Sequence, residues 1–216
     1  MITGEMSVNK LYRMKILVIL GHPAEKSFNH AIAESAIQRL RKCGHEIWFH
    51  DLYSENFDPL LNEDEIPSNG NLSDAITKHC FELSACDGII VIHPNWWGQP
   101  PAVLKGWIDR VFRPGIAYEF REGDQGEGIP IGLLKAKSAI VFNTSNTSEA
   151  REKFVFLDPL ETIWKNCIFH LCGIHDFHRK MFRILITSTE EERMKWLNEV
   201  DQQVAKTFPK SSFVAD

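Results

Sequence analysis

Three short polar loops carry the residues best suited to binding chemistry, and each loop directly follows an apolar run. The first loop, residues 21–29, reads Gly-His-Pro-Ala-Glu-Lys-Ser-Phe-Asn and leads straight into a helical pattern. Backbone N–H groups at the N-terminus of a helix attract anions, and Ser27 and Asn29 add polar side chains there. The loop therefore predicts a site for a phosphate-like anion. The alternative is that Ser27 or Asn29 only caps the helix, as these residue types often do.

The second loop, residues 93–101, reads His-Pro-Asn-Trp-Trp-Gly-Gln-Pro-Pro and is the most informative segment of the chain. Two adjacent Trp residues in a tight turn cannot both point into the core, so at least one of Trp96 and Trp97 should face a crevice. Such rings stack on a flat ligand, and the backbone N–H groups of residues 95–98 would meet the ligand's edge. The alternative is that both rings close the core beneath the next helix.

The third loop, residues 143–148, consists of six small polar residues, Asn-Thr-Ser-Asn-Thr-Ser. Residues of this kind also make ordinary surface turns. Beside the other two loops, they supply the donors and acceptors that the edge of a heterocycle requires. The chain contains neither G-x-G-x-x-G nor a Walker A sequence, which argues against a dinucleotide fingerprint and a P-loop.

The segments between the loops predict alternating strands and helices, because short continuous apolar runs are typical of parallel strands buried on both faces. We expect strands at residues 15–20, 46–50, 88–93, 138–142 and 182–187, and helices at residues 29–43, 73–85, 101–112, 157–169 and 190–207. Right-handed βαβ units of this kind build a three-layer α/β fold with a doubly wound, parallel, five-stranded sheet. Its ligand should lie at the carboxyl ends of the strands, where the three loops are.

The composition indicates a folded protein and argues against nucleic acid as a partner. The 216 residues are 44% hydrophobic and 25% charged, with 24 Lys and Arg against 29 Asp and Glu, a net charge of −5. No basic stripe is present that would neutralise a phosphate backbone. The first apolar run, residues 16–20, is far shorter than the roughly 20 residues of a membrane span, so no transmembrane segment is expected.

Residues 1–13 are polar and aperiodic, and Met14 is a second plausible start just before the first strand. We therefore expect an N-terminal extension over residues 1–13, disordered or foreign to the natural chain, and one domain over residues 14–216. The five cysteines are scattered without a C-x-x-C pair, which argues against a disulfide framework or a zinc ribbon. Together these features predict a cytoplasmic protein.

One cluster of residues invites a metal assignment: His170, His175 and His178 with Cys167 and Cys172. Its spacing fits no standard zinc pattern, and the sequence between these residues indicates a helix end that runs into a loop. We therefore predict no metal site.

We predict structural rather than catalytic roles for the remaining acidic, cysteine and arginine residues. The acidic run at residues 63–65 is expected to be a solvated loop. Cys43 and Cys86 have apolar neighbours and should be small core residues. Arg110 could reach a carboxylate or a cofactor phosphate, but its place on the polar side of a helix favours a surface or dimer contact.

Several short motifs occur in an order that resembles a known family. They are Gly-His-x4-Ser-Phe-Asn at 21–29, Asp-Leu-Tyr at 51–53, Asn-Phe-Asp-Pro at 56–59, His-Pro-x-x-Trp at 93–97, Pro-Ala-x-Leu-Lys-Gly-Trp at 101–107, Arg-Val-Phe at 110–112, Ala-Tyr at 117–118 and Leu-Cys-Gly at 171–173. Over residues 15–173 the chain resembles the flavodoxin-like NAD(P)H:quinone oxidoreductases, the family of DT-diaphorase, the modulators of drug activity and the ancillary subunits of potassium efflux systems.

The resemblance implies a flavodoxin-like fold and a homodimer with the active site at the subunit interface. It also implies a flavin cofactor, FMN or FAD, and two-electron ping-pong hydride transfer from NAD(P)H to a quinone-like acceptor, with azo and nitro compounds as further acceptors. Carried over by motif, the residues that would bind the flavin are His22, Ser27, Phe28 and Asn29 in the first loop, Pro94, Asn95, Trp96, Trp97 and Gly98 in the second, and Asn143, Thr144, Ser145 and Asn146 in the third. Tyr118 and Phe120 match a pair that lines the substrate face.

The chain departs from DT-diaphorase at two points. Ser145 and Asn146 stand where that enzyme has glycines, and no Tyr or His occurs between Tyr118 and His170 to stabilise charge on a reduced flavin. No catalytic proton donor is therefore assigned. Hydride transfer between stacked rings depends mainly on proximity and orientation, so activity does not require one.

Two other functions fit the same residues. One is a flavin-binding regulatory or ancillary subunit that senses NAD(P)H or quinones and binds a partner protein. The other is a one-electron carrier like the true flavodoxins, which fits less well because those proteins use a Ser/Thr-rich phosphate loop and are usually far more acidic.

Overall fold

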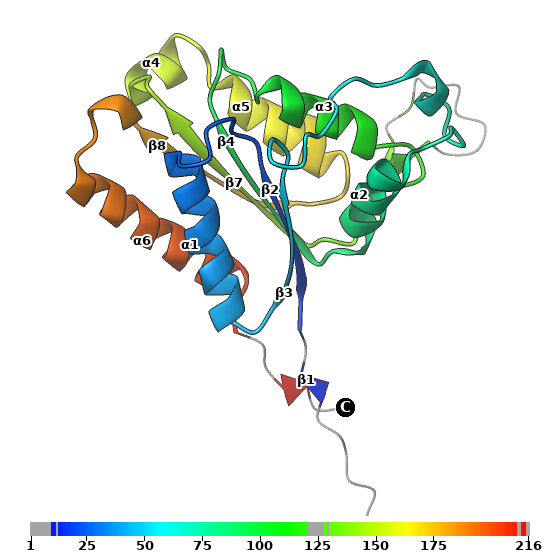
Figure 1. Cartoon of the computed structure of the whole chain (residues 1–216), viewed down its shortest axis with the longest axis horizontal. Coiled ribbons are helices and arrows are strands. Elements are labelled where there is room, and N and C mark those ends of the chain that lie inside the picture. The colour runs from blue at the N-terminus through cyan, green and yellow to red at the C-terminus, as the bar shows by residue number, and fades with distance from the viewer. Residues whose placement is uncertain (1–9, 12, 121–127, 129, 211–212, 215–216) are drawn as a thin grey trace, which may run out of the picture.

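The computed structural model describes residues 10–11, 13–120, 128, 130–210 and 213–214, and its centre is a parallel sheet of five strands (Figure 1). The strand order is β3-β2-β4-β7-β8. These strands are β2 (Lys15–Leu20), β3 (Glu46–Asp51), β4 (Gly88–Pro94), β7 (Ser138–Ser145) and β8 (Asp176–Arg183). After β2 the chain adds β3 on one side and then β4 on the other. The sheet is therefore doubly wound, as expected, with its switch point at β2 and β4.

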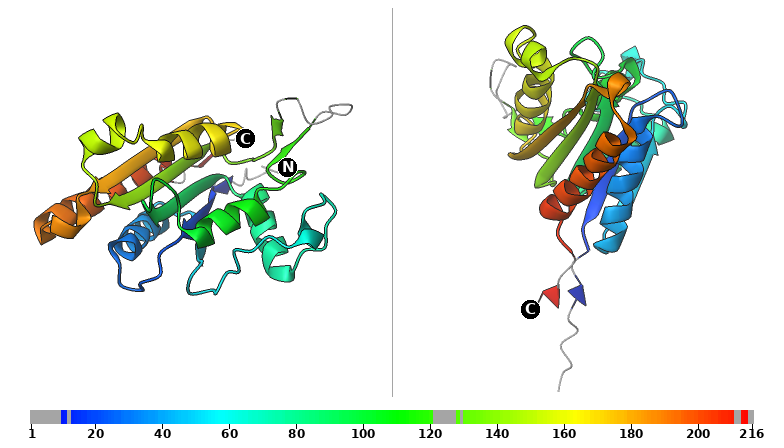
Figure 2. Two further views of the ribbon diagram at one scale, coloured as in Figure 1. Left: turned by 90° about the horizontal axis from the view of Figure 1, so that it is seen from above. Right: turned by 90° about the vertical axis from the view of Figure 1, so that its left-hand side faces the viewer.

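Two helix layers enclose the sheet (Figure 2). Helices α1 (Phe28–Lys42) and α6 (Glu190–Thr207) lie side by side on one face. The other face carries α2 (Asp74–Ala85), α3 (Ala102–Val111) and the continuous segment of α5 (Pro159–Glu161) and the π-helix η2 (Thr162–His170). Side chains of β2 alternate between the layers, so that Leu17 and Ile19 face α2 and α3 while Val18 faces α1. Both faces of the central strands are apolar because both are covered.

The remaining elements are short. They are β1 (Lys10–Leu11), paired antiparallel with β9 (Phe213–Val214), the hairpin of β5 (Tyr118–Glu119) and β6 (Ile131–Gly132), α4 (Glu149–Phe154), and the 3-10 turns η1 (Glu63–Glu65) and η3 (Leu185–Thr187). Most of the expected N-terminal extension lies outside the described residues. None of the described helices combines the length and apolarity that crossing a membrane requires.

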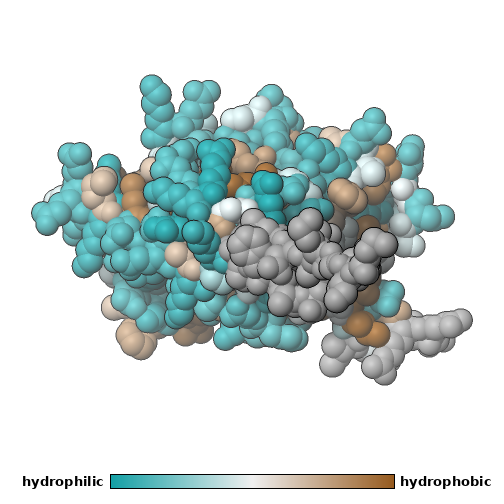
Figure 3. All heavy atoms as spheres, turned by 90° about the horizontal axis from the view of Figure 1, so that it is seen from below, coloured by the Kyte–Doolittle hydropathy of each residue, from teal (hydrophilic) through white to brown (hydrophobic). Residues whose placement is uncertain are grey.

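The end of the molecule opposite the carboxyl ends of the strands is mostly hydrophilic, with small separate hydrophobic groups outside the grey residues (Figure 3). The three polar loops lie at the other end, where the parallel strands finish (Figure 1).

Three elements differ from the sequence prediction by more than one residue. The fifth strand covers Asp176–Arg183 rather than residues 182–187, because this edge strand is half exposed and carries charged residues instead of an apolar run. The apolar residues beyond it form η3 at the surface. Strand β7 continues to Ser145, three residues into the expected third loop. The helix expected from residue 157 begins at Pro159, because Leu157 and Asp158 have positive φ.

The prediction was wrong for Glu65 and for Arg110, whereas Glu63 and Asp64 are exposed as expected. Glu65 is buried and Arg110 is buried with it, the Arg110 Nε donating to Glu65 Oε2 at 2.8 Å. Arg110 Nη1 also donates to the carbonyl oxygen of Asp58 at 2.6 Å. The loop after β3 packs on α3 at Gly106 and Arg110, so this part of the helix faces protein, while Lys105 and Asp109 stay exposed. The paired guanidinium lowers the pKa of the Glu65 carboxyl despite its burial.

Candidate active site

The structure brings the three loops together at the carboxyl edge of the sheet. Asn29, at the start of α1, donates from Nδ2 to the Oγ1 of Thr144 at 2.9 Å. The backbone N–H of Asn95 donates to the carbonyl oxygen of Thr144 at 2.7 Å. The rings of His22 and Trp96 lie 6.3 Å apart, centre to centre. Thr144 is thus the central link between the loops that follow β2, β4 and β7.

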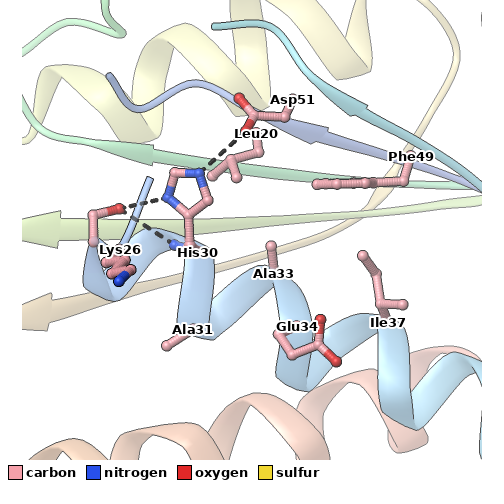
Figure 4. A pocket seen from close by; sticks show the side chains of 10 residues that line it. Leu20, Lys26, His30, Ala31, Ala33, Glu34, Ile37, Phe49 and Asp51 are labelled. Atoms are coloured by element: carbon pink, nitrogen blue, oxygen red, sulfur yellow. Dashed lines mark hydrogen bonds and ion pairs between the residues drawn. The ribbon is translucent and has the colours of Figure 1, made fainter. Parts of the chain in front are cut away.

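The first loop is held by its helix cap. Ser27 is the N-cap of α1, and its Oγ accepts from the backbone N–H of His30 at 3.4 Å and lies 2.8 Å from His30 Nδ1. His30 Nε2 contacts Asp51 Oδ2 at 3.1 Å, and Figure 4 shows the ring turned toward that carboxylate. Burial opposes ionisation of Asp51, but hydrogen bonds from Ser54 and His30 outweigh it and lower its pKa. The start of α1 is thus held by its own cap and by a contact with the end of β3.

The same contacts border a hollow of about 390 Å³ beside α1 (Figure 4). Lys26 and Ser27 lie at its rim, and Phe49 and Ile37 supply apolar walls. Ser27 therefore caps α1, as the alternative interpretation of the first loop proposed. The helix N-terminus next to it still offers N–H groups to an anion.

The second loop contains a type I′ turn. Trp96 and Gln99 exchange both backbone hydrogen bonds, at 3.1 and 2.9 Å, and the two residues between them have positive φ, 57° at Trp97 and 71° at Gly98. A Cβ on Gly98 would lie 2.7 Å from Pro159 Cγ, so only glycine fits there. The turn exposes Trp97 completely and Trp96 by 42%, so the two rings do not both close the core beneath the next helix.

Asn95 holds this turn from below. Its Oδ1 accepts from the backbone N–H of Gly98 at 3.0 Å, and its Nδ2 donates to Glu152 Oε1 at 3.1 Å. The residues Asn95, Trp97, Gly98, Thr147, Arg151, Glu152, Phe156 and Pro159 line a cavity of about 690 Å³. Glu152 was not expected here, because a Glu among the charged residues of a short helix is usually solvated. No sequence pattern would have identified it.

Asn143 points into the core below the site. Its Nδ2 donates to His93 Nε2 at 2.9 Å, and its Oδ1 accepts from Arg179 Nη1 at 3.4 Å. Trp164 Nε1 donates to the same His93 nitrogen at 2.9 Å, so Nε2 is unprotonated. His93 Nδ1 then carries the hydrogen and donates to the carbonyl oxygen of Pro94 at 2.8 Å. Burial lowers the pKa of His93 to about 4, so the ring is neutral at pH 7.

The other predicted side chains of the third loop are also engaged within the protein. Ser145 Oγ accepts from the N–H of Thr147 at 3.1 Å, and Asn146 Oδ1 accepts from the N–H of Ile186 at 2.9 Å. In the first loop, the ring of Phe28 packs against Phe182 and Trp196 between α1 and α6. These side chains shape the loops.

Tyr118 and Phe120 do not join the three loops. Their rings pack edge to face, 5.9 Å apart, on a separate cavity of about 410 Å³. Residues of α3 and η2, among them Ile108, Cys167 and Leu171, form the rest of its wall.

Within the described part of the chain, His50, Glu55 and His79 form the group whose ligand atoms lie close enough for a metal ion, within 4.8 Å of one another. The indole of Trp107 donates to His79 Nδ1 at 3.2 Å, so a neutral His79 carries its hydrogen on Nε2, facing Glu55. Burial, then the neighbouring His50, lowers the pKa of His79 to about 4. Burial opposes protonation of His50, but hydrogen bonds to Glu55 and Glu82 outweigh it and raise its pKa. The group is a hydrogen-bonded network in which protons occupy the positions a metal would need.

The fold and the linked loops define a flavodoxin-like protein, and comparison with known proteins agrees. The model of the flavodoxin-like fold family matches residues 14–206. An uncharacterized NAD(P)H oxidoreductase of Haemophilus influenzae is 35% identical over 174 residues, which cover 78% of this chain and 83% of that protein. Ribosyldihydronicotinamide dehydrogenase (quinone) of Mus musculus is 31% identical over 206 residues, which cover 83% of this chain and 85% of that protein.

A solved structure shares the fold at lower identity. The FMN-dependent NADH-azoreductase of Bacillus anthracis, in complex with FMN, matches with a TM-score of 0.73 and 13% identity over 90% of this chain and 99% of that one. From the family match and the two relatives, the chain belongs to the flavodoxin-like NAD(P)H:quinone oxidoreductase family and is an NAD(P)H-dependent oxidoreductase.

Proposed function

We propose that the chain is a flavin-dependent NAD(P)H dehydrogenase that passes a hydride to a quinone in a two-electron ping-pong cycle. The observation that carries the proposal is the direct linkage of the loops through Asn29, Thr144 and Asn95. This linkage puts a helix N-terminus, which suits a phosphate, on the same edge as the exposed Trp97 and its cavity, which suit a ring. A flavin needs both.

Two orphaned acceptors support the fit to a flavin. Asn29 Oδ1 and Glu152 Oε2 are buried and find no hydrogen-bond partner among the described residues. A flavin offers ring N–H and chain hydroxyl donors to such atoms. The predicted residues of the first loop would hold its phosphate, those of the second its ring, and those of the third the ring's edge, mainly through backbone groups because their side chains are engaged. When bound, the flavin supplies a ring that takes up and releases a hydride.

The chain's own contribution is to bind, orient and exclude water. The type I′ turn holds Trp97 and Gly98 in one conformation, and a stacked ring beside them is shielded from solvent. His93, below the second loop, has both ring nitrogens occupied and stays neutral. It neither gives nor takes a proton in the reaction, and we assign no catalytic acid.

We also infer a homodimer with the site at its interface. Exposed apolar side chains flank Phe156, which lines the cavity, with Phe154 at 80%, Val155 at 66% and Leu157 at 77% exposure. Tyr118 and Phe120 lie away from the loops of their own chain, so in a homodimer they would line the site of the other subunit.

Mixing two inactive variants tests the shared site. We expect Ser27→Asp and the double variant Tyr118→Ala/Phe120→Ala to regain activity when their subunits are exchanged, because each mixed dimer then holds one intact site. With equal mixing, about a quarter of all sites are intact in a two-fold symmetric dimer. No recovery after proven subunit exchange, or a monomer by light scattering, would refute the interface proposal.

The cofactor and the acceptor are tested in one experiment. Purified protein should be yellow, NADPH should bleach it anaerobically, and menadione should restore the colour rapidly. Colourless protein that neither FMN nor FAD reconstitutes would refute the proposal. Protein that bleaches but is not reoxidised by any quinone would instead favour the ancillary-subunit alternative.

The five cysteines are all free thiols, which suits the reducing cytoplasm that we propose as its location.

A further inference from the structure

Glu152 is a completely buried acid on a helix whose other charged residues are exposed. Its backbone N–H donates to the carbonyl oxygen of Ser148 at 3.0 Å, and its own carbonyl oxygen accepts from the N–H of Asp158 at 2.9 Å. The backbone is thus held on both sides. The side chain is directed inward by the fold rather than by an ion pair, because no lysine or arginine among the described residues pairs with it.

The two carboxyl oxygens of Glu152 have different surroundings. Oε1 accepts the hydrogen bond from Asn95 Nδ2, whereas Oε2 is buried and has no partner among the described residues. A buried polar atom left without a partner costs about 1–3 kcal/mol. An ionised carboxyl oxygen only accepts hydrogen bonds, so its missing partner is a donor.

The cavity next to Glu152 has the shape and lining for a flat ring. Trp97, Phe156 and Pro159 contribute rings to its wall, and Pro159 lies against Gly98 of the turn. Its volume of about 690 Å³ is in the range of small-molecule sites, which combine apolar walls with a few polar groups that select the ligand. Thr147 and Arg151 also line this cavity, and Glu152 is its buried acid with an unpartnered oxygen.

We propose that Glu152 Oε2 accepts a hydrogen bond from an amide-type N–H at the edge of the ring bound in this cavity, while Oε1 keeps Asn95 in place under the turn. This assignment rests on the proposed function, which supplies two rings with such a group: the N3–H of a flavin and the carboxamide of a nicotinamide. Glu152 would then be the residue that distinguishes these rings from analogues without the N–H.

The first arm of the test uses flavin. Apoprotein is titrated with FMN and with N3-methyl-FMN, and binding is followed by flavin fluorescence. If the flavin is the donor, the wild type should bind the methylated form roughly 10- to 100-fold more weakly, the value of a hydrogen bond to a charged group. Glu152→Gln should bind FMN more weakly and lose most of this discrimination, because its amide presents a donor to the cavity once its oxygen holds Asn95.

The second arm uses the nicotinamide. Oxidised protein is titrated with NADP⁺ and with its 3-acetylpyridine analogue, which lacks the N–H, and quenching of tryptophan fluorescence reports binding. If the nicotinamide is the donor, the wild type should prefer NADP⁺ by a similar factor and Glu152→Gln should not. Glu149→Gln, on the same helix but exposed and paired with Lys153, is the matched control and should behave as wild type in both arms.

Loss of discrimination in either arm supports the assignment and identifies the donor. Discrimination in Glu152→Gln equal to that of the wild type in both arms overturns it. Equal binding of parent and analogue by the wild type in both arms also overturns it, and this result does not depend on how well the variant folds. A wild type that binds neither FMN nor FAD refutes the proposed function itself, which separates the two failures.

Discussion

His93 should make the protein lose stability as the pH falls, and the structure determines the pH window. The folded state holds the ring neutral, with a pKa of about 4, whereas an unfolded histidine protonates near pH 6.5. Between these values the unfolded state binds a proton that the folded state does not. The stabilising contribution is therefore complete above pH 6.5 and is lost as the pH falls toward 4.

The size of the effect follows from this difference. A single site of this kind reduces the free energy of unfolding by up to about 1.4 kcal/mol per pH unit, which gives about 2 kcal/mol between pH 7 and pH 5. His79, whose pKa is also lowered to about 4, adds a similar slope. Other groups add more, so only a difference between variants isolates His93.

The perturbation that isolates it is His93→Gln. The glutamine oxygen replaces the ring nitrogen as acceptor for Trp164 and Asn143 but does not titrate. Urea unfolding, followed by circular dichroism at several pH values and at equal cofactor content, gives the free energy of unfolding of both proteins. The variant should be less stable at pH 7, by about 1 kcal/mol for the lost bond to Pro94, and should lose about 2 kcal/mol less than the wild type by pH 5.

Parallel curves for wild type and variant between pH 7 and pH 5 would refute the reasoning, because they would mean that His93 is protonated in the fold or that its network rearranges freely. His175→Gln, at an exposed histidine, controls for the replacement of an imidazole as such.

Two further predictions concern the loops. Ser27→Asp should weaken flavin binding by about 1–4 kcal/mol, since it puts a like charge within a few ångströms of the phosphate. Equilibrium dialysis measures the flavin affinity, and Ser68→Asp, on an exposed loop, is the control. Unchanged affinity in Ser27→Asp would exclude the first loop as the anion site. Gly98→Ala should lower both the flavin content of the purified protein and the fluorescence anisotropy of Trp97, because alanine at this position combines a positive φ with a 2.7 Å contact to Pro159. Full flavin content in this variant would show that flavin binding does not need the turn.

The strands that position the site were predictable from sequence where burial is symmetrical. Strands β2 and β4 are covered on both faces, so their apolar runs are continuous and their ends lie within a residue of the prediction. The edge strand β8 lacks such a run and was misplaced, because charged residues interrupt it on both faces: Arg179 pairs with Glu161 of α5, and Lys180 is exposed on the other face. An apolar run marks a strand that is buried on both faces, and an edge strand is only partly buried, so its sequence lacks this pattern.

The inward direction of Asn143 follows from strand parity once β7 is extended to Ser145. Residues two apart on a strand share a face, so Asn143 lies on the side of Val141, facing η2, and His93 lies likewise on the side of Val91. Thr144 has the opposite parity and faces α1, where Asn29 meets it. The prediction ended the strand at residue 142 and treated Asn143 and Thr144 as loop, and a loop has no parity from which to separate them.

This parity divides the polar residues at the sheet edge into two functions. Asn143 and His93 face the covered side and use every hydrogen-bonding group on the protein, so they stabilise the ends of β4 and β7. Other groups keep hydrogen-bonding capacity, and among the described residues of the three loops and α4 the buried side-chain atoms without a partner are Asn29 Oδ1 and Glu152 Oε2. Both are acceptors. A ligand that satisfies both must present N–H or O–H donors at two separate points, a requirement that an aromatic hydrocarbon does not meet.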